Sequence, residues 1–184
     1  MLYQLVETKG IPTTQIIPTH INYSAGLLED SMAFIEGGGR VDLNAFEDPR
    51  SEEHALSVAS AVQFYQEKNI SLDSISVSSD ANGSLARFDE MGRMTGLSVA
   101  GQGSLLANFK FLLENRIVDL TSATKMFSTN PAGFYRLENK GEILVGKDAD
   151  FLMLDSNTNL TDVIVGGRRM MVDGEVIAKG TFVS

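Results

Sequence analysis

Two residues of this chain have side chains suited to metal or proton chemistry, and each follows a short strand-like run. His20 follows Ile16-Ile17-Pro18-Thr19, and Asp80 follows Ser76-Val77-Ser78-Ser79. Imidazole is a common metal ligand, and a carboxylate can bind a metal or carry a proton to and from water. Helical patterns separate the two runs. A (β/α) barrel places its catalytic groups at the C-terminal ends of its strands, so the arrangement indicates a metal-dependent hydrolase.

Each of these residues also has a purely structural interpretation. A lone histidine at a strand end often bonds to a backbone carbonyl, and spacing alone favours that role for His20. The sequence Asp80-Ala81-Asn82-Gly83 suits a turn, so local sequence leaves Asp80 open to both roles. Ser84 could donate a hydrogen bond to a substrate carboxylate, but the local sequence favours ordinary loop polarity as its explanation. His54 is expected to be a solvated surface histidine.

Composition narrows the classes of partner and of metal site. The 184 residues include 24 acidic and 15 basic side chains, giving a net charge of -9, which disfavours nucleic acid and anionic membranes as partners. The chain has no cysteine, so disulfides and thiolate metal sites are excluded. With only two histidines, one copy cannot build a three-histidine zinc site. No signal peptide and no apolar run of ~20 residues is evident, so a cytoplasmic protein is expected.

The elements that must position His20 and Asp80 alternate between strands and helices. Strands are predicted at 16–19, 40–46 and 74–79. Helices are predicted at 26–36, from an N-cap at Ser51, at 105–113 and at 121–130. Residues 80–102 are rich in glycine and polar residues, which predicts one long loop. Alternation of strands and helices implies parallel pairing and an α/β fold.

The pattern changes after about Gly133, where short strands and turns replace the helices. The pair Asp173-Gly174 between apolar runs is a strong hairpin signal. We therefore expect residues 1–133 to form part of a (β/α)8 TIM barrel and residues 134–184 a small C-terminal β module. A complete barrel has eight strands and ~250 residues. Three units would leave strand edges and an apolar sheet face unmatched.

Taken together, four segments resemble the amidohydrolase superfamily and, within it, the isoaspartyl (β-aspartyl) dipeptidases. They are Pro18-Thr19-His20-Ile21-Asn22, residues 78–84 (Ser-Ser-Asp-Ala-Asn-Gly-Ser), Val99-Ala100-Gly101 and residues 141–150 (Gly-Glu-Ile through Ala-Asp). The closing Lys179-Gly180-Thr181-Phe182 also fits. The likeness covers essentially the whole chain.

The resemblance implies a role for each candidate residue. His20, at the end of barrel strand six, would be a ligand of the second zinc ion. Asp80, at the end of strand eight, would belong to the metal site, bind the metal-bridging hydroxide and act as general base and then acid. Ser84 would help to hold the α-carboxylate of the substrate. The implied reaction is hydrolysis of the isopeptide bond in β-aspartyl dipeptides.

The chain departs from the family pattern in two ways. Tyr23 occupies the position of an arginine that clamps the substrate carboxylate, and tyrosine brings neither a charge nor a bidentate fork. The strand-one His-x-His, the bridging lysine and the strand-five histidine of the family would lie upstream of Met1. The chain thus corresponds to the C-terminal half of such an enzyme, and we expect it not to hold a binuclear zinc site alone.

Two other interpretations stay open at this point. The half-barrel could be a non-catalytic module that pairs its open edges with another copy, as a homo-oligomer, or with a separate N-terminal half. Alternatively, the amidohydrolase fold could serve a different amide, such as a cyclic dihydropyrimidine. The Ser-Asp-x-Asn-Gly-Ser segment argues against that substrate, whereas Tyr23 leaves it open.

Overall fold

The computed structural model describes residues 6, 8–52 and 55–178 of the chain. The predictions about His54 and about residues 179–182 lie outside this range. No helix in the described part of the chain has both the length and the apolar character needed to cross a membrane.

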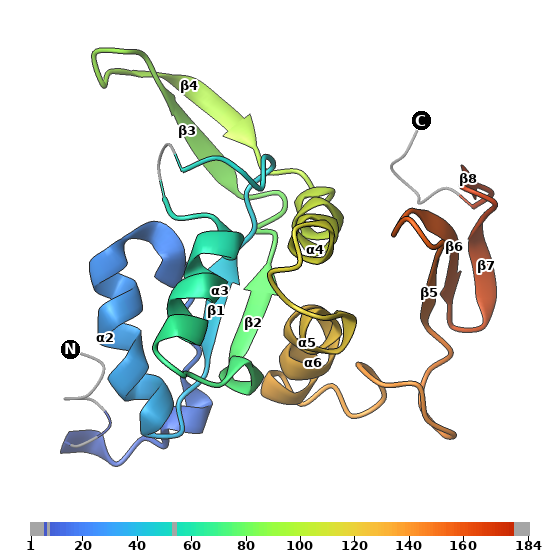
Figure 1. Ribbon diagram of the computed structural model, residues 1–184, viewed down its shortest axis with the longest axis horizontal. Helices are drawn as coiled ribbons and strands as arrows, with labels where there is room; N and C mark the ends of the chain where they lie inside the picture. The colour runs from blue at the N-terminus through green and yellow to red at the C-terminus, as the bar shows by residue number, and fades with distance from the viewer. Residues whose placement is uncertain (1–5, 7, 53–54, 179–184) are drawn as a thin grey trace.

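A parallel strand pair forms the centre of the molecule (Figure 1). Strand β1 (Val41–Asn44) pairs with β2 (Ile75–Ser78), in a register that places Val41 opposite Ile75 and Asn44 opposite Ser78. Helix α2 (Ala25–Glu36) precedes β1, and α3 (Val58–Glu67) connects the two strands. The predicted α/β fold with parallel pairing is therefore confirmed, with strands shorter than predicted at both positions.

The two faces of this strand pair differ in chemistry, because successive side chains of a strand point to opposite sides. Apolar side chains on one face are buried in the main hydrophobic core with residues of α2 and α3: Val41, Leu43, Ile75 and Val77. Polar side chains occupy the other face: Asp42, Asn44, Ser76 and Ser78. The expectation of an unmatched apolar face is wrong, because helices cover that face and the opposite face is polar.

The segment 16–19 is not a strand. It lies between the short 3-10 turns η1 (Thr13–Gln15) and η2 (Ile21–Tyr23). A backbone hydrogen bond of 2.9 Å from the N–H of Asp42 to the carbonyl of Pro18 ties it to β1. Pro18 has no N–H to donate to a ladder, and His20 turns the chain with a φ of 62°. The predicted strand is therefore an extended segment beside β1.

Helix α3 begins six residues later than a cap at Ser51 would place it. The observed N-cap is Ser57, whose hydroxyl accepts a hydrogen bond from the N–H of Ser60. The chain before the helix is held elsewhere, because the N–H of Leu56 donates to the carbonyl of Asn22 at 2.8 Å. The start of the helix is thus set by a tertiary contact in addition to the local capping signal.

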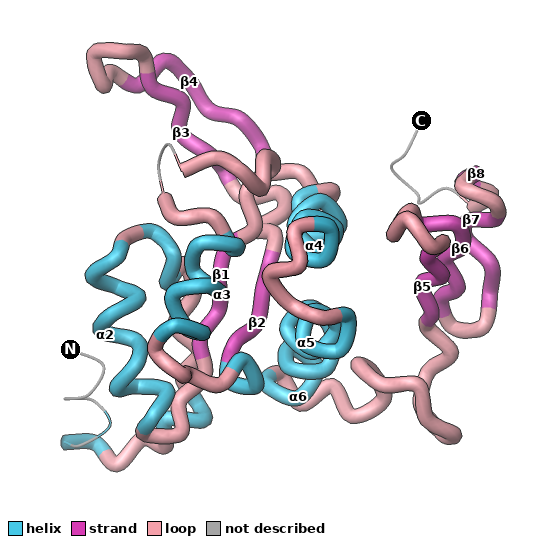
Figure 2. Tube along the Cα trace, viewed as in Figure 1, coloured by secondary structure: helices cyan, strands magenta, loops and turns pink. Residues whose placement is uncertain are grey.

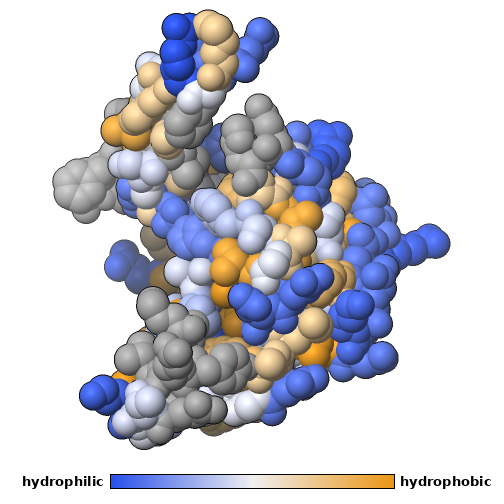
Figure 3. Space-filling model, turned by 90° about the vertical axis from the view of Figure 1, so that its left-hand side faces the viewer, coloured by the Kyte–Doolittle hydropathy of each residue, from blue (hydrophilic) through white to orange (hydrophobic). Residues whose placement is uncertain are grey.

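Residues 80–102 contain a hairpin where one long loop was predicted. Strand β3 (Ser84–Phe88) pairs antiparallel with β4 (Met94–Val99). The connecting turn is closed by the carboxylate of Asp89, which accepts hydrogen bonds from the N–H groups of Met91 and Arg93. The hairpin stands out from the rest of the molecule, as Figures 1 and 3 show.

The helices after the hairpin complete the packing of the strand pair. Helix α4 (Ser104–Glu114) is followed by an almost continuous helical stretch. This stretch consists of α5 (Leu120–Thr124), a π-helical turn η4 (Lys125–Thr129) and α6 (Asn130–Phe134). Pro131 lies in the first turn of α6 and does not end the helix, because the first turn needs no N–H donor at that position.

A loop-rich segment then leads to a four-stranded antiparallel sheet (Figure 2). Its strands follow each other in chain order: β5 (Phe151–Leu154), β6 (Leu160–Val165), β7 (Arg168–Val172) and β8 (Glu175–Val176). Residues 141–143 of the segment that resembles the amidohydrolases form no strand. The hairpin signal at Asp173-Gly174 is confirmed, since both residues have positive φ, 50° and 82°, between β7 and β8.

Candidate metal and catalytic site

The structure brings His20 and Asp80 together, although 60 positions separate them in the chain. The imidazole Nε2 of His20 lies 3.4 Å from the carboxylate Oδ2 of Asp80. His20 follows the segment that lies beside β1, and Asp80 lies two residues beyond β2. The side chains are 34% and 38% exposed, so the pair is reachable from solvent. The structure therefore brings together the two residues singled out by their place after strand-like runs.

The backbone at both residues is in the left-handed region. His20 has a φ of 62° and Asp80 a φ of 48°. Such a conformation costs a non-glycine residue of order 1 kcal/mol, and it is found at functional sites more often than elsewhere. At Asp80 a tight turn holds it in place, because the N–H of Gly83 donates to the carbonyl of Asp80 at 2.9 Å.

Gly83 allows the carboxylate of Asp80 to fold back over the turn. A Cβ atom at Gly83 would lie 2.7 Å from the carbonyl oxygen of Asp80 and 2.9 Å from its Oδ2. Both distances are shorter than a Cβ atom tolerates, so a larger residue at position 83 would displace the carboxylate that faces His20. Position 83 therefore requires a glycine for steric reasons.

Tyr23 belongs to the same cluster of side chains. Its ring makes an edge contact with the imidazole of His20, at 4.9 Å between centroids, and lies 5.7 Å from the ring of Phe46. Its hydroxyl accepts a long hydrogen bond of 3.5 Å from the Nδ2 of Asn44. Among the side chains that the structure describes, no lysine or arginine forms an ion pair or hydrogen bond with His20, Tyr23 or Asp80. Asp80 is the acidic group that faces His20.

Ser84 lies at the base of the hairpin, as the first residue of β3, opposite Val99. The hairpin base is fixed by hydrogen bonds from Asn82 N–H to the carbonyl of Ala100 and from Ala100 N–H to the carbonyl of Gly83. The side chain of Ser84 is exposed, and nothing in the described structure joins it to His20 or Asp80 directly. Ser84 is thus near the site in sequence, but it is not part of the His20–Asp80 contact.

The amides of Asn22 and Asn44 were not predicted as site residues. Asn22 is fully buried, and its side chain bonds to the backbone of Asn44 at the end of β1. Asn44 is 2% exposed, and its Oδ1 has no hydrogen-bond partner among the residues that the structure describes. Asn22 belongs to the Pro-Thr-His-Ile-Asn segment, so the sequence could identify the residue. It could not predict the hydrogen bonds of Asn22 to the backbone of Asn44.

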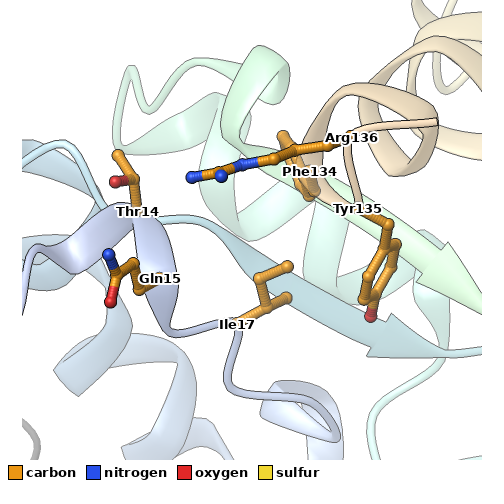
Figure 4. A pocket seen from close by; sticks show the side chains of 6 residues that line it. All are labelled: Thr14, Gln15, Ile17, Phe134, Tyr135 and Arg136. Carbon is orange, nitrogen blue, oxygen red and sulfur yellow. The ribbon is translucent and has the colours of Figure 1, made fainter. Parts of the chain in front are cut away.

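A separate hollow of about 480 Å³ lies away from this pair. Figure 4 shows that Thr14, Gln15 and Ile17 face residues 134–136 across it. Burial raises the pKa of Tyr135, and the negative charge of Asp42 raises this pKa further. Tyr135 is therefore close enough to the polar face of β1 to feel the charge of Asp42. His20 and Asp80 do not line this hollow.

The donor atoms of His20 and Asp80 suit a zinc ion in kind and in spacing. Zinc binds imidazole nitrogen and carboxylate oxygen, and two donors of a tetrahedral site lie about 3.4 Å apart. The observed separation of 3.4 Å matches this value. Within residues 6, 8–52 and 55–178, however, no group of three or more histidine, cysteine, aspartate or glutamate side chains gathers. A catalytic zinc ion takes three protein ligands, so His20 and Asp80 alone would not complete such a site.

Comparison with known proteins shows which family and which solved structures the chain resembles. Residues 5–183 match the model of the amidohydrolase family. Two structures of the β-aspartyl dipeptidase from Fervidobacterium islandicum AW-1 resemble the chain. One is a complex with the β-Asp-Leu dipeptide (32% identity, TM-score 0.85), and the other has 29% identity and a TM-score of 0.80. A D-hydantoinase shares the fold, at 17% identity and a TM-score of 0.60.

The matched region covers nearly all of this chain but less than half of each dipeptidase chain. The dipeptidase structures cover 98% of this chain, whereas the chain covers 45% and 44% of theirs. The chain thus spans less than half the length of the structures it matches. Because the family model covers nearly all of the residues, the chain belongs to the amidohydrolase family.

Proposed function

We propose that the protein carrying this sequence is a zinc-dependent hydrolase of β-aspartyl dipeptides. In this proposal residues 1–133 supply strands six to eight of a (β/α)8 barrel with their helices, and residues 134–184 form a small β module. The observation that carries the proposal is the contact between His20 and Asp80, an imidazole nitrogen and a carboxylate that are both able to bind a metal ion. The 32% identity to a dipeptidase crystallised with β-Asp-Leu supports the substrate class.

Asp80 would perform the proton transfers of the reaction. His20 and Asp80 would hold a divalent metal ion together with ligands from outside the described residues, and that ion would polarise the scissile carbonyl as a Lewis acid. The carboxylate of Asp80 would accept a proton from the attacking water and deliver it to the leaving amine. Its partial exposure, 38%, leaves room for water and substrate to approach. His20 would keep the metal close to Asp80.

Tyr23 and Ser84 would bind the substrate. The ring of Tyr23 packs on His20, so its hydroxyl can donate a hydrogen bond to a substrate carboxylate beside the metal. Ser84, at the hairpin base, would provide a second hydroxyl donor. Neither group carries a charge, so we expect weaker binding of a free carboxylate than an arginine would give. Because Tyr23 and Ser84 are uncharged, hydrolysis of another amide is the second candidate function.

The exposed apolar side chains of the C-terminal region favour association with another polypeptide. Val145, Ile143 and Leu152 are 108%, 78% and 65% exposed. Large apolar side chains in such numbers mark interaction surfaces more often than free surface. We therefore include in the proposal that the protein is a homo-oligomer or pairs with the remaining half of a barrel, which light scattering of the purified protein tests.

Substrate selectivity tests the proposed function directly. The full-length protein that contains this sequence is assayed with β-Asp-Leu and with its α-linked isomer, before and after removal of metal by a chelator. We expect cleavage of the β-linked dipeptide alone, loss of activity on chelation and recovery with zinc. Cleavage of a cyclic amide in preference to β-Asp-Leu would support the second candidate, and unchanged activity after complete metal removal would contradict both.

A further inference from the structure

A buried carboxylate lies beneath the candidate site. Asp42 is on the polar face of β1 and is only 3% exposed. Its Oδ2 accepts hydrogen bonds from the hydroxyls of Thr19, at 2.7 Å, and Ser78, at 2.6 Å. Its Oδ1 accepts one from the hydroxyl of Ser76, at 2.7 Å. Asp42 thus takes three hydroxyl donors from two different segments of the chain.

The two donors on Oδ2 precede the two site residues. Thr19 is the residue directly before His20, and Ser78 lies two positions before Asp80. The N–H of Asp42 also donates to the carbonyl of Pro18, so backbone and side chain of Asp42 both hold the segment that leads to His20. A single oxygen atom therefore connects the supports of His20 and Asp80.

A buried carboxylate in this position lowers the stability of the fold unless other groups compensate it. Burial of a carboxylate costs several kcal/mol unless hydrogen bonds or a counter-charge compensate it. Among the side chains that the structure describes, no lysine or arginine forms an ion pair with Asp42, and three hydroxyls donate hydrogen bonds to it. An apolar residue would fill a strand interior at lower cost. Polar groups that break such a local rule are concentrated at functional sites.

We infer that Asp42 is a positioning residue whose Oδ2 sets the spacing between His20 Nε2 and Asp80 Oδ2. By holding Thr19 and Ser78 on one atom, it fixes the points from which the two site residues leave the strand pair. A site must be held within about 0.5 Å of its productive geometry, which a shared buried acceptor achieves and a loop alone does not. The inference rests on the proposed roles of His20 and Asp80, but the contact can be measured without turnover.

The tautomer of His20 reports on this contact. In the neutral ring, a carboxylate facing Nε2 favours the proton on that nitrogen. Long-range ¹H–¹⁵N spectra of the metal-free chain, recorded at a pH where the imidazole is neutral, distinguish the two tautomers. His54 is assigned with a His54→Gln variant and serves as the internal reference. We expect the Nε2–H form to predominate for His20 in the unaltered chain.

Three substitutions separate positioning from general stabilisation. Thr19→Val and Ser78→Ala each remove one donor from Oδ2, whereas Ser76→Ala removes the donor from Oδ1 of the same carboxylate and is the matched control. We expect the first two to shift His20 to a mixture of both tautomers and the control to leave the Nε2–H form predominant. Thr19→Ser, which keeps the hydroxyl, should restore the original spectrum.

Each outcome of this experiment decides for or against the inference. Equal spectra for all four variants, equal shifts in all three donor-removing variants, or a predominant Nδ1–H form in the unaltered chain would overturn it. Thermal unfolding shows whether each variant is folded. If Thr19→Val does not fold, Ser78→Ala and its hydroxyl-retaining partner Ser78→Thr decide the question. A failed dipeptidase assay with the expected tautomer pattern would overturn the proposed function alone.

Discussion

The side-chain amide of Asn22 is bonded to both backbone groups of Asn44. Asn22 Oδ1 accepts from the N–H of Asn44 at 2.8 Å, and its Nδ2 donates to the carbonyl of Asn44 at 3.0 Å. The same Nδ2 donates to the carbonyl of Leu56 at 2.7 Å. The side chain of Asn22, two residues after His20, thus completes the backbone pairing at the carboxyl end of β1. It joins the turn that carries His20 to the strand and to the approach of α3.

Replacing Asn22 by alanine is expected to destabilise the fold strongly. The change leaves one N–H and two carbonyls without their partner in a fully buried position, and each such group costs about 1–3 kcal/mol. We expect the free energy of unfolding in urea to fall by about 3 kcal/mol. Asn115→Ala is the control, because Asn115 is exposed and makes one hydrogen bond to the carbonyl of Phe111, so its loss should cost below about 1 kcal/mol. Equal effects of the two changes would contradict the role given to Asn22.

Gly83→Ala is expected to displace the carboxylate of Asp80. Its Cβ would meet the Oδ2 of Asp80 at 2.9 Å and the carbonyl at 2.7 Å. A shift of about 1 Å at a reacting group can lower a rate about 100-fold, so we expect a fall of that order in kcat for β-Asp-Leu. Gly103→Ala is the matched control, since a Cβ atom at position 103 would meet nothing within 4 Å. Wild-type kcat in the Gly83→Ala enzyme would show that the site tolerates the displacement.

Tyr65 is expected to make stability depend on alkaline pH. Burial raises the pKa of Tyr65 to about 12, although a hydrogen bond with Ser31 lowers it in part. The unfolded chain loses the phenol proton near pH 10, while the folded chain keeps it until about pH 12. The contribution is therefore fully present below pH ~10 and is lost as the pH rises toward the folded pKa, by up to about 2–3 kcal/mol.

Urea titrations at several values between pH 9 and 12 measure this loss, and Tyr65→Phe isolates the tyrosine. The variant lacks the 2.7 Å hydrogen bond with Ser31, so it should be about 1 kcal/mol less stable at neutral pH. Its stability should fall less steeply with rising pH than that of the unaltered chain. Parallel pH profiles for the two proteins would contradict the assignment.

Tyr23→Arg is expected to favour substrates with a free carboxylate. An arginine at this position could form a bidentate pair with a carboxylate, which the tyrosine hydroxyl cannot. We expect the KM for β-Asp-Leu to fall about tenfold, equivalent to about 1.4 kcal/mol of binding, with little change for the β-Asp-Leu amide. Tyr23→Phe, which removes the proposed hydroxyl donor, should raise the KM for β-Asp-Leu more than that for its amide. A Tyr23→Arg enzyme that gains equally on the amide would show that position 23 does not contact the carboxylate.

Sequence reasoning singled out His20 and Asp80 by their place after strand-like runs, and the structure brings these two side chains into contact. That signal survives even though the first run is not a strand, since Pro18 prevents ladder pairing while its carbonyl still bonds to Asp42. Elements fixed by local chemistry, such as the turn at Asp173-Gly174, were also predictable. The sequence of one chain therefore indicates where the chain turns and which residues lie directly after those turns.

Features that depend on distant contacts were not predictable in the same way. The start of α3 at Val58 follows from bonds between Asn22 and Leu56, which lie 34 positions apart. The hairpin in 80–102 is different, because its turn is local and was missed when the glycines of the segment suggested a loop. In the sequence, Asp42 is only one polar position in an alternating strand. The fold shows that its carboxylate accepts hydrogen bonds from the hydroxyls of Thr19 and Ser78. Long-range pairing of this kind leaves no local periodic signal.

The central claim is that Asp80, facing His20, performs the proton transfers of β-aspartyl dipeptide hydrolysis. The most direct measurement is kcat for β-Asp-Leu in the full-length, zinc-loaded protein carrying Asp80→Asn, with Asp30→Asn on the exposed surface of α2 as the control. Loss of a general acid–base group lowers the rate about 100- to 10,000-fold, so we predict a fall in that range for Asp80→Asn and no change for Asp30→Asn. A kcat for Asp80→Asn within a few-fold of the unaltered enzyme, at equal zinc content, would contradict the account.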